Sequence, residues 1–421
     1  MKRIGEIYVY ELKKIVSRKL VWIAGLIIVL LCAFCGFGDL ISSSYYGEGS
    51  ISGYDVMKTV REYARSFSGR KIDDSLLQEM QDSYTKETVG DNNKETVVMQ
   101  NNNSILSDGE ISISIGMSQD NEADNGITEY APIYSYVQEI TNNYELTLEA
   151  DSNGLYNERE KAILQNRADQ MLTEKEMDFW TEKESQIETP FTYEITEGWK
   201  NLWIYACTVN DMVLLMLAIC LSGVFSTEHL RKTDSIILCS KYGKKHLYLA
   251  KILAGITFGA VVSLLFWGIT AIFSVLAYGA DGFGAALQLA FPFSTWNITV
   301  GESVLVLLLV LLVISVLYSV AIMVLSEILK NSVAVMALPV GIMILTIMID
   351  IPYQFRIASQ IYDLLPTNLL FTSELWDDRL FPLFGNYLIN YQIAPVIYLL
   401  VTVVLFFVGK KVYLKYQIGA R

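Results

Sequence analysis

The hydrophobic positions of this chain are gathered into long blocks that carry almost no charge. A helix that crosses the hydrocarbon core of a bilayer needs roughly 17–25 mostly apolar residues. Six blocks reach or approach that length: Leu20–Gly38, Trp203–Phe225, Ile252–Ala277, Val304–Leu325, Val333–Ile349 and Ile393–Val408. The last two are short, and we expect flanking Tyr and Trp at the interface to extend them. The pattern predicts an all-α polytopic membrane protein with six spanning helices.

Residues 1–19 have a different pattern, in which apolar and basic positions alternate at helical spacing. Ile4, Ile7, Tyr8, Leu12 and Ile15 fall on one face of a helix, and basic residues occupy the rest. Such a helix is expected to lie along the inner leaflet before the first span.

A basic start followed by an apolar run is also typical of a cleavable signal peptide. Here the run is near full spanning length, and the "GFGDLISSS" that follows is a poor cleavage site. We therefore expect residues 20–41 to be a retained first span.

Lys and Arg predict the orientation, because short cytoplasmic loops carry an excess of both. With the N-terminus inside, only Arg356 and Arg379 fall in the two short outer loops. The inner segments then hold the following cations: Lys2, Arg3, Lys13, Lys14, Arg18, Lys19, Arg231, Lys232, Lys241, Lys244, Lys245, Lys251, Lys330, Lys410, Lys411, Lys415 and Arg421. We expect both termini to be cytoplasmic, with residues 42–202 outside the cell and residues 203–421 forming the rest of the membrane domain.

The outer segment is acidic, with 31 Asp and Glu against 13 Lys and Arg between residues 42 and 200. Residues 55–88 and 155–186 are patterned as polar helices, and Glu110–Gly116 alternates like a strand. This predicts an α+β extracellular domain. Its charge argues against nucleic acid as a partner and is compatible with cationic partners, or with a surface that is merely soluble and self-repelling.

Several chemistries have no motif in this chain. It contains no Gly-x-x-x-x-Gly-Lys-Ser/Thr phosphate loop and no His-Glu-x-x-His, and neither His229 nor His246 has a nucleophile and carboxylate around it. Cys32-x-x-Cys35 has redox spacing but lies in an apolar span, where thiols are usually inert. We therefore expect no enzyme activity, no metal site and no cofactor on this chain.

The predicted spans are nearly free of charge, with Asn210-Asp211 as a partial exception. At about 1.5 Å per residue, Asp211 would lie about 12 Å below the outer end of a helix that starts near Trp203. Asp211 is either part of a water-exposed helix end or the lining of a wet pathway. Because ion-driven carriers place several charges inside the membrane, any pumping here must take its energy from another molecule.

The loop 226–251 carries a short helix pattern between two spans. Leu230, Ile237 and Leu238 share one face, Thr233-Asp234 is suited to start a helix, and Gly243 to stop one. The apolar side chains of such a helix need cover, either from lipid headgroups or from a groove on a partner protein.

This loop, "FSTEHLRKTDSIILCSKYGKKHLYLAKILAG", resembles the inner loop of bacterial ABC exporter permeases of the type 2 exporter superfamily. The matching positions are Phe225, Glu228, Arg231, Thr233, Ile236-Ile237-Leu238, Lys244 and Lys251. Two positions depart from the pattern: Lys232 replaces the usual Gly, and Lys241-Tyr242 replaces a Pro or Thr turn. The amphipathic start, the outer insertion and "LLPTNLL" before the last span also fit that family.

The resemblance implies a permease subunit that pairs with a second permease subunit and docks onto a separate cytosolic ABC ATPase, which would bind ATP and Mg. The stretch around Asp234–Ser240 would be the coupling helix. The residues of the loop that would couple to the ATPase are Glu228, Arg231, Asp234, Ile237, Leu238 and Lys244. Spans two and five would line the path, with Asp211 and a kink at Pro339. Substrates in this family include antimicrobial peptides, lipids and drugs. Two alternatives are a complex that senses peptides without transporting them and a scaffold that displays the outer domain.

Overall fold

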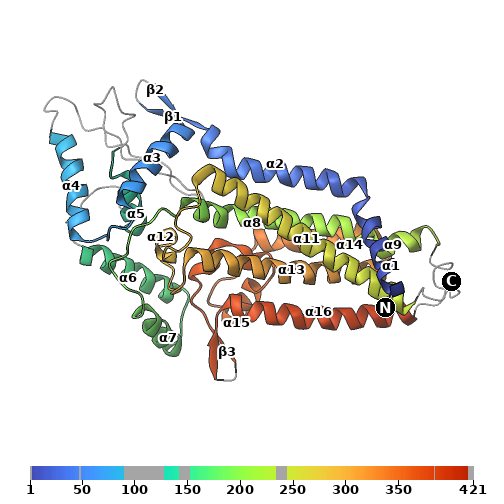
Figure 1. Cartoon of the computed structure of the whole chain (residues 1–421). Coiled ribbons are helices and arrows are strands. Elements are labelled where there is room, and N and C mark those ends of the chain that lie inside the picture. The colour runs from blue at the N-terminus through green and yellow to red at the C-terminus, as the bar shows by residue number, and fades with distance from the viewer. Residues whose placement is uncertain are drawn as a thin grey trace.

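The computed structural model describes residues 2–46, 49–89, 128–141, 152–233, 244–383 and 385–415 of the chain. Most of this part is helical, and the helices form a long bundle with a smaller group of helices at one end (Figure 1). The expected strand Glu110–Gly116 and the expected coupling segment Asp234–Ser240 lie outside the described residues.

Five helices in the described part are long and apolar enough to cross a membrane, so the prediction of a membrane protein is confirmed at that level. They are α2 (Lys19–Ile41), α8 (Glu197–Leu221) with its continuation α9 (Gly223–Leu230), α11 (Lys245–Tyr278), α13 (Val300–Leu329) and α16 (Asn390–Lys415). The fifth expected span corresponds to α14 (Ser332–Met348), which has 17 residues and falls short of the length of the others.

α13 is the central helix of the bundle and packs against α8, α11 and α16. Small residues let these helices approach closely, which is how packing stabilises helix pairs where lipid surrounds them. A Cβ on Gly259 of α11 would lie 2.2 Å from the hydroxyl of Ser319 on α13. One turn away, the hydroxyls of Ser263 and Ser315 lie 2.5 Å apart across the same interface.

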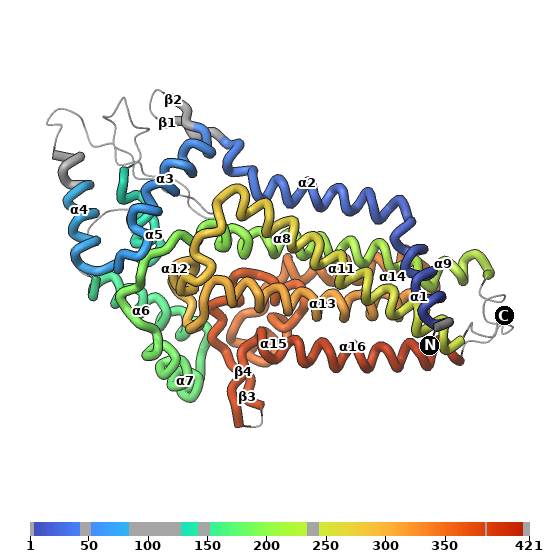
Figure 2. The backbone as a smooth tube through the Cα atoms, viewed as in Figure 1, coloured from blue at the N-terminus to red at the C-terminus, as the bar shows by residue number. Residues whose placement is uncertain are grey.

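The amphipathic start of the chain forms α1 (Lys2–Val16), which crosses the end of the bundle and packs on α11 (Figure 2). Tyr8 donates a hydrogen bond to the Thr257 hydroxyl at 3.0 Å, and Ile15 is buried. α1 therefore makes specific protein contacts along the face that sequence assigns to lipid.

Apart from Arg356 and Arg379, the described Lys and Arg residues outside the segment 42–202 gather where α1, the end of α9, the start of α11 and the ends of α13 and α16 meet, which we call the basic end. The opposite end, which we call the insert end, carries helices from the segment between α2 and α8 (Figure 1). The two ends therefore differ in charge as the positive-inside pattern requires.

The insert consists, in its described part, of a hairpin and five helices. The hairpin pairs β1 (Ser43–Tyr46) with β2 (Gly49–Ser52), and the helices are α3 (Gly53–Phe67), α4 (Asp74–Val89), α5 (Ala131–Thr141), α6 (Ser152–Asp169) and α7 (Glu174–Glu184). Each of the two helices expected from sequence is thus divided in two. Gly69, at a φ of +85°, turns the chain between α3 and α4, and a capping box at Thr173 starts α7 afresh.

Short elements complete the insert end of the bundle. They are α12 (Leu287–Ala290), α15 (Arg356–Asp363), the 3-10 turns η1 (Asn368–Leu370) and η2 (Thr372–Trp376), and a hairpin of β3 (Phe381–Leu383) and β4 (Asn386–Leu388). The hairpin pairs Phe381 with Leu388 in antiparallel register. The segment from α15 to β4 lies under α6 and α7 of the insert, and this contact is polar.

Candidate functional site

The helix that leaves the bundle toward the expected coupling segment is interrupted by one residue, Ser222, between α8 and α9. Ser326 of α13 inserts its side chain at this point. The Ser326 hydroxyl accepts hydrogen bonds from the backbone N–H groups of Phe225 and Ser226 at 3.3 and 2.9 Å, and donates to the Ser222 carbonyl at 2.5 Å. The backbone of Ser222 keeps right-handed helical angles, so α9 continues α8 past this point.

α9 is tied to its neighbours by a partly buried ion cluster of Glu11, Lys14, Glu228 and Lys251, which we call the α9 joint. The two carboxylate oxygens of Glu228 contact different helices. Oε1 accepts from Lys14 of α1 at 2.9 Å, and Oε2 lies 2.5 Å from Nζ of Lys251 on α11. Glu11 lies 3.6 Å from Lys14. One side chain of α9 therefore connects both flanking helices.

Lys251 is fully buried, and its charge is compensated from several directions. Besides Glu228, its ammonium group donates to the Val224 carbonyl at 3.2 Å and lies 4.7 Å from the centre of the Phe225 ring. A buried ammonium without such partners would cost several kcal/mol. The α9 joint holds two acids and two bases, so it is electrically balanced.

Two further contacts attach the same region to the bundle. His229 of α9 lies 3.0 Å from Oε2 of the buried Glu327 on α13. Arg18, in the link between α1 and α2, donates to the Cys220 carbonyl near the end of α8 at 2.9 Å. α9 is thus bonded to α1, α11 and α13, and a displacement of α9 would act on all three.

The residues expected to contact an ATPase occupy different environments. Glu228 is turned into the protein, where the α9 joint uses it. Arg231 and Lys244 are exposed at the two edges of the segment that connects α9 with α11. Asp234, Ile237 and Leu238 lie outside the described residues, so their docking role stays a prediction.

The two residues expected along a path lie on helices that pack against each other, α8 and α14. Asp211 is 7% exposed in the middle of α8, and its Oδ1 has no hydrogen-bond partner within the described chain; the same holds for both polar atoms of Asn210. Pro339 is buried inside α14, and the helix continues through it. A role for Asp211 and Pro339 in a path stays a prediction.

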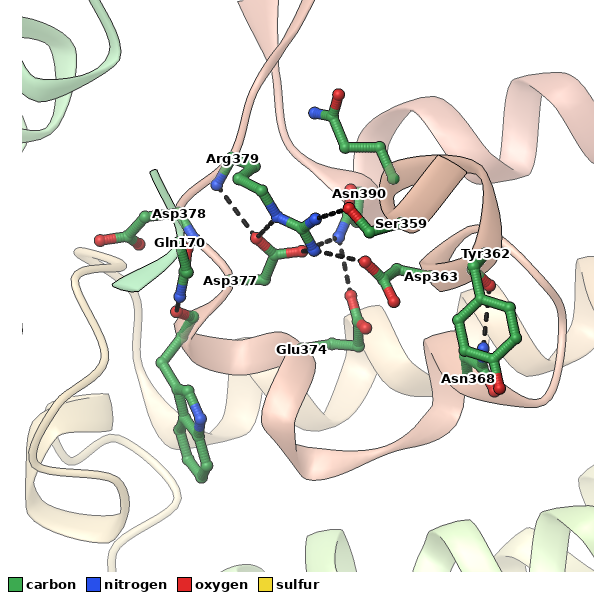
Figure 3. A network of polar contacts seen from close by, with 12 residues as sticks. Gln170, Ser359, Tyr362, Asp363, Asn368, Glu374, Asp377, Asp378, Arg379 and Asn390 are labelled. Carbon is green, nitrogen blue, oxygen red and sulfur yellow. Dashed lines mark hydrogen bonds and ion pairs between the residues drawn. The ribbon is translucent and has the colours of Figure 1, made fainter. Parts of the chain in front are cut away.

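A second cluster of buried charges lies at the insert end, and we call it the acid cluster: Asp363, Glu374, Asp377, Arg379 and Asn390 (Figure 3). Arg379 is 1% exposed, and it donates to both oxygens of Asp377, at 2.9 and 2.8 Å, and to Ser359 and Asp363. The Tyr353 ring covers the guanidinium group at 4.5 Å. The cluster joins α15, η2 and the first residue of α16.

The residues just beside the acid cluster hold the insert in place. Asp378 pairs with Arg167 of α6 at 2.7 Å, and its carbonyl and N–H bond to Trp180 and Gln170. Glu176 of α7 accepts from the Leu380 N–H at 2.8 Å and pairs with Arg356. Backbone hydrogen bonds of this kind hold the pKa of Glu176 below its usual range against the effect of burial.

Sequence reasoning missed most of these partners. Arg356 and Arg379 were expected as loop cations, yet both form ion pairs with carboxylates. Lys251 was expected among the cytoplasmic cations, yet it is fully buried, as is Glu327. The sequence does show several Asp and Glu residues close to these cations along the chain. Which of them form ion pairs can be decided only once the fold is known.

The comparisons with known proteins give no further guidance. No family model, no curated protein and no solved structure matches this chain. Within the described residues, no group of three or more His, Cys, Asp and Glu side chains is arranged to hold a metal ion. The functional argument therefore depends on the geometry of the α9 joint and on the sequence pattern around it.

Proposed function

We propose that this chain is the membrane-spanning subunit of an exporter that is driven by ATP hydrolysis on a separate cytosolic ATPase. In this proposal α14 is the fifth of six spans, the basic end faces the cytoplasm and the insert lies outside the cell. A second permease subunit completes the assembly. The chain itself carries no ATP site, and Mg and ATP belong to the partner.

The observation that carries the proposal is the attachment of α9. This helix continues a spanning helix past Ser222, and Glu228 bonds it to α1 and α11 at the same time. A partner that pulls on the segment after α9 would therefore move three helices together. Ordinary loops between spans need no such buried ion pairs, because water satisfies their charges at no cost.

Two features suggest where a substrate would pass. Asn210 and Asp211 leave buried polar atoms without partners in the described chain, which is costly in a membrane. α8 carries both residues and is continuous with α9, so a displacement of α9 reaches them directly. A substrate, or a rearranged bundle, would then supply the missing partners.

The direct test is co-purification of the chain with the ATPase encoded beside it. Ile237→Asp with Leu238→Asp places two charges on the apolar face of the coupling segment and is expected to abolish the complex. The matched control, Ile237→Val with Leu238→Met, keeps that face apolar and should retain the complex. An intact complex after the double Asp change would exclude this segment as the docking site.

The transport step needs its own readout. Vesicles that contain the chain and its ATPase should move substrate only with ATP. A histidine kinase that co-purifies in place of transport activity would favour peptide sensing, and the absence of any ATPase from the native complex would favour a scaffold.

A further inference from the structure

The acid cluster carries more acid than base. Arg379 is the only cation in contact with Asp363 and Asp377 within the described chain, and Glu374 makes no ion pair there. The exposed fractions of Glu374 and Asp377 are only 6% and 7%. If all three carboxyls were ionised, two negative charges would remain uncompensated in a buried site, which is costly enough to favour protonation.

The geometry identifies the carboxyl group that takes the proton. Nδ2 of Asn390 donates to Oε2 of Glu374 at 2.7 Å and to Oδ2 of Asp377 at 2.8 Å, so the two carboxyl groups converge on one nitrogen atom. Asp377 is paired through both oxygens with the guanidinium group of Arg379. Glu374 has no such partner, so the shared site holds its proton on Glu374.

We propose that Glu374, together with Asp377 and Asn390, forms a proton-binding site that tightens the contact between η2 and α16 as the pH falls. The proton neutralises Glu374 and removes its repulsion of Asp377 while the Asn390 bond is kept. Loss of the proton places two adjacent negative charges at the first turn of α16. This inference holds whether or not the chain works with an ATPase.

The charges around the site agree with this direction. Burial, followed by the charge of Asp377, raises the pKa of Glu374 well above its usual value. Burial also raises the pKa of Asp378 and of Asp363 to about 6 in each case. The titratable and charged groups that face Glu374 are Asp377 and Arg379 from its own segment, Asp363 from α15, Tyr353 before it, and Tyr391 and Tyr398 from α16.

The sign of the linkage follows from the raised values. A carboxyl group with a higher pKa in the folded state stabilises that state most at low pH, and this contribution is lost as the pH rises through the folded value. The contact between η2 and α16 is therefore strongest at low pH and weakest at high pH.

The site also reaches the insert. The last residue of η2 and the residues after it bond to α6 and α7 through the Trp376 carbonyl, Asp378 and the Leu380 N–H. Because these contacts continue directly from the turn that carries Glu374, a loosened η2 weakens the support of the insert. Proton binding thus controls how firmly the insert is attached to the bundle.

The test compares thermal unfolding of the full-length protein with that of Glu374→Gln in detergent micelles across a pH series. Gln is neutral at every pH and keeps a partner for Asn390. The two midpoints should agree at about pH 5, and the variant should be higher by roughly 2–4 °C at about pH 9. Glu182→Gln on the exposed face of α7 is the matched control, and it should follow the wild type throughout.

Two results would overturn the proposal: equal pH profiles for wild type and Glu374→Gln, or a variant that is less stable at every pH. If Glu374→Gln gives no folded protein, Asn390→Asp decides, because it adds a further acid to the same point. Its midpoint should fall more at about pH 9 than at about pH 5, and an equal fall at both would exclude a proton-binding role.

Discussion

The α9 joint and the acid cluster are both buried groups of charged side chains, and they differ in balance. The α9 joint has two carboxylates and two ammonium groups, and Glu228 contacts both cations. The acid cluster has three carboxyl groups and one guanidinium group. A balanced cluster needs no proton to be stable, whereas an acid-rich one does.

The difference predicts opposite behaviour when pH changes. Burial lowers the pKa of Lys14, but the hydrogen bond and charge of Glu228 outweigh this, so its pKa lies above the usual lysine value. A base with a raised pKa contributes its stability below that value and loses it only in strong alkali. The Lys14–Glu228 pair is thus expected to be constant near neutral pH, while the acid cluster responds there.

The largest effect is expected from Glu228→Gln, which leaves Lys251 buried without a negative partner. The free energy of unfolding should fall by about 3–5 kcal/mol, as for other broken buried pairs. Chemical unfolding of the purified protein measures this, with Glu6→Gln on the exposed face of α1 as control. Alkali should reduce the loss, because it removes the charge of the unpaired ammonium group.

A second change shows whether the stability loss of Glu228→Gln comes from the unpaired charge or from lost side-chain packing. Lys251→Met in the Glu228→Gln background removes the stranded charge and should restore most of the stability. A double variant as weak as the single one would mean that the joint acts through packing alone.

The next largest effect is expected from Arg379→Gln, which removes the only cation of the acid cluster. We expect a loss of about 2–4 kcal/mol near neutral pH, because the freed carboxylates can relieve part of the cost by taking up protons. Acid should reduce this loss, which is the opposite of the Glu228→Gln result. If the stability loss of Arg379→Gln and that of Glu228→Gln changed with pH in the same direction, the proposed difference between the two clusters would be wrong.

The smallest effect is expected from Lys14→Met, at the edge of the α9 joint. The Lys14 side chain is 37% exposed, and a pair of that kind stabilises by about 0.5–1 kcal/mol. Lys251 continues to neutralise Glu228, so the fold should persist. A loss as large as that of Glu228→Gln would show that α1, and not α11, is the main support of α9.

Much of the fold follows from sequence, because hydrophobic blocks and cation positions are local signals. They identify the five long apolar helices and the amphipathic α1. The contacts of Glu228 with Lys14 and Lys251 could not be predicted in the same way. Lys14 is far from Glu228 in the sequence, and the choice of partner depends on how α1 lies across α11. The acid cluster has the same origin, since its members meet only when η2 folds against α16.

The hydroxyl of Ser326 has a consequence for how the helical turn after Ser222 can move. A serine oxygen offers one proton and two lone pairs, and here all three are engaged by the backbone of a single turn. No lone pair or proton is left for a partly opened arrangement, and Ser326 is fully buried, so water is not at hand to supply substitutes. The turn should therefore be either fully bonded to Ser326 or fully released from it, without stable intermediate positions.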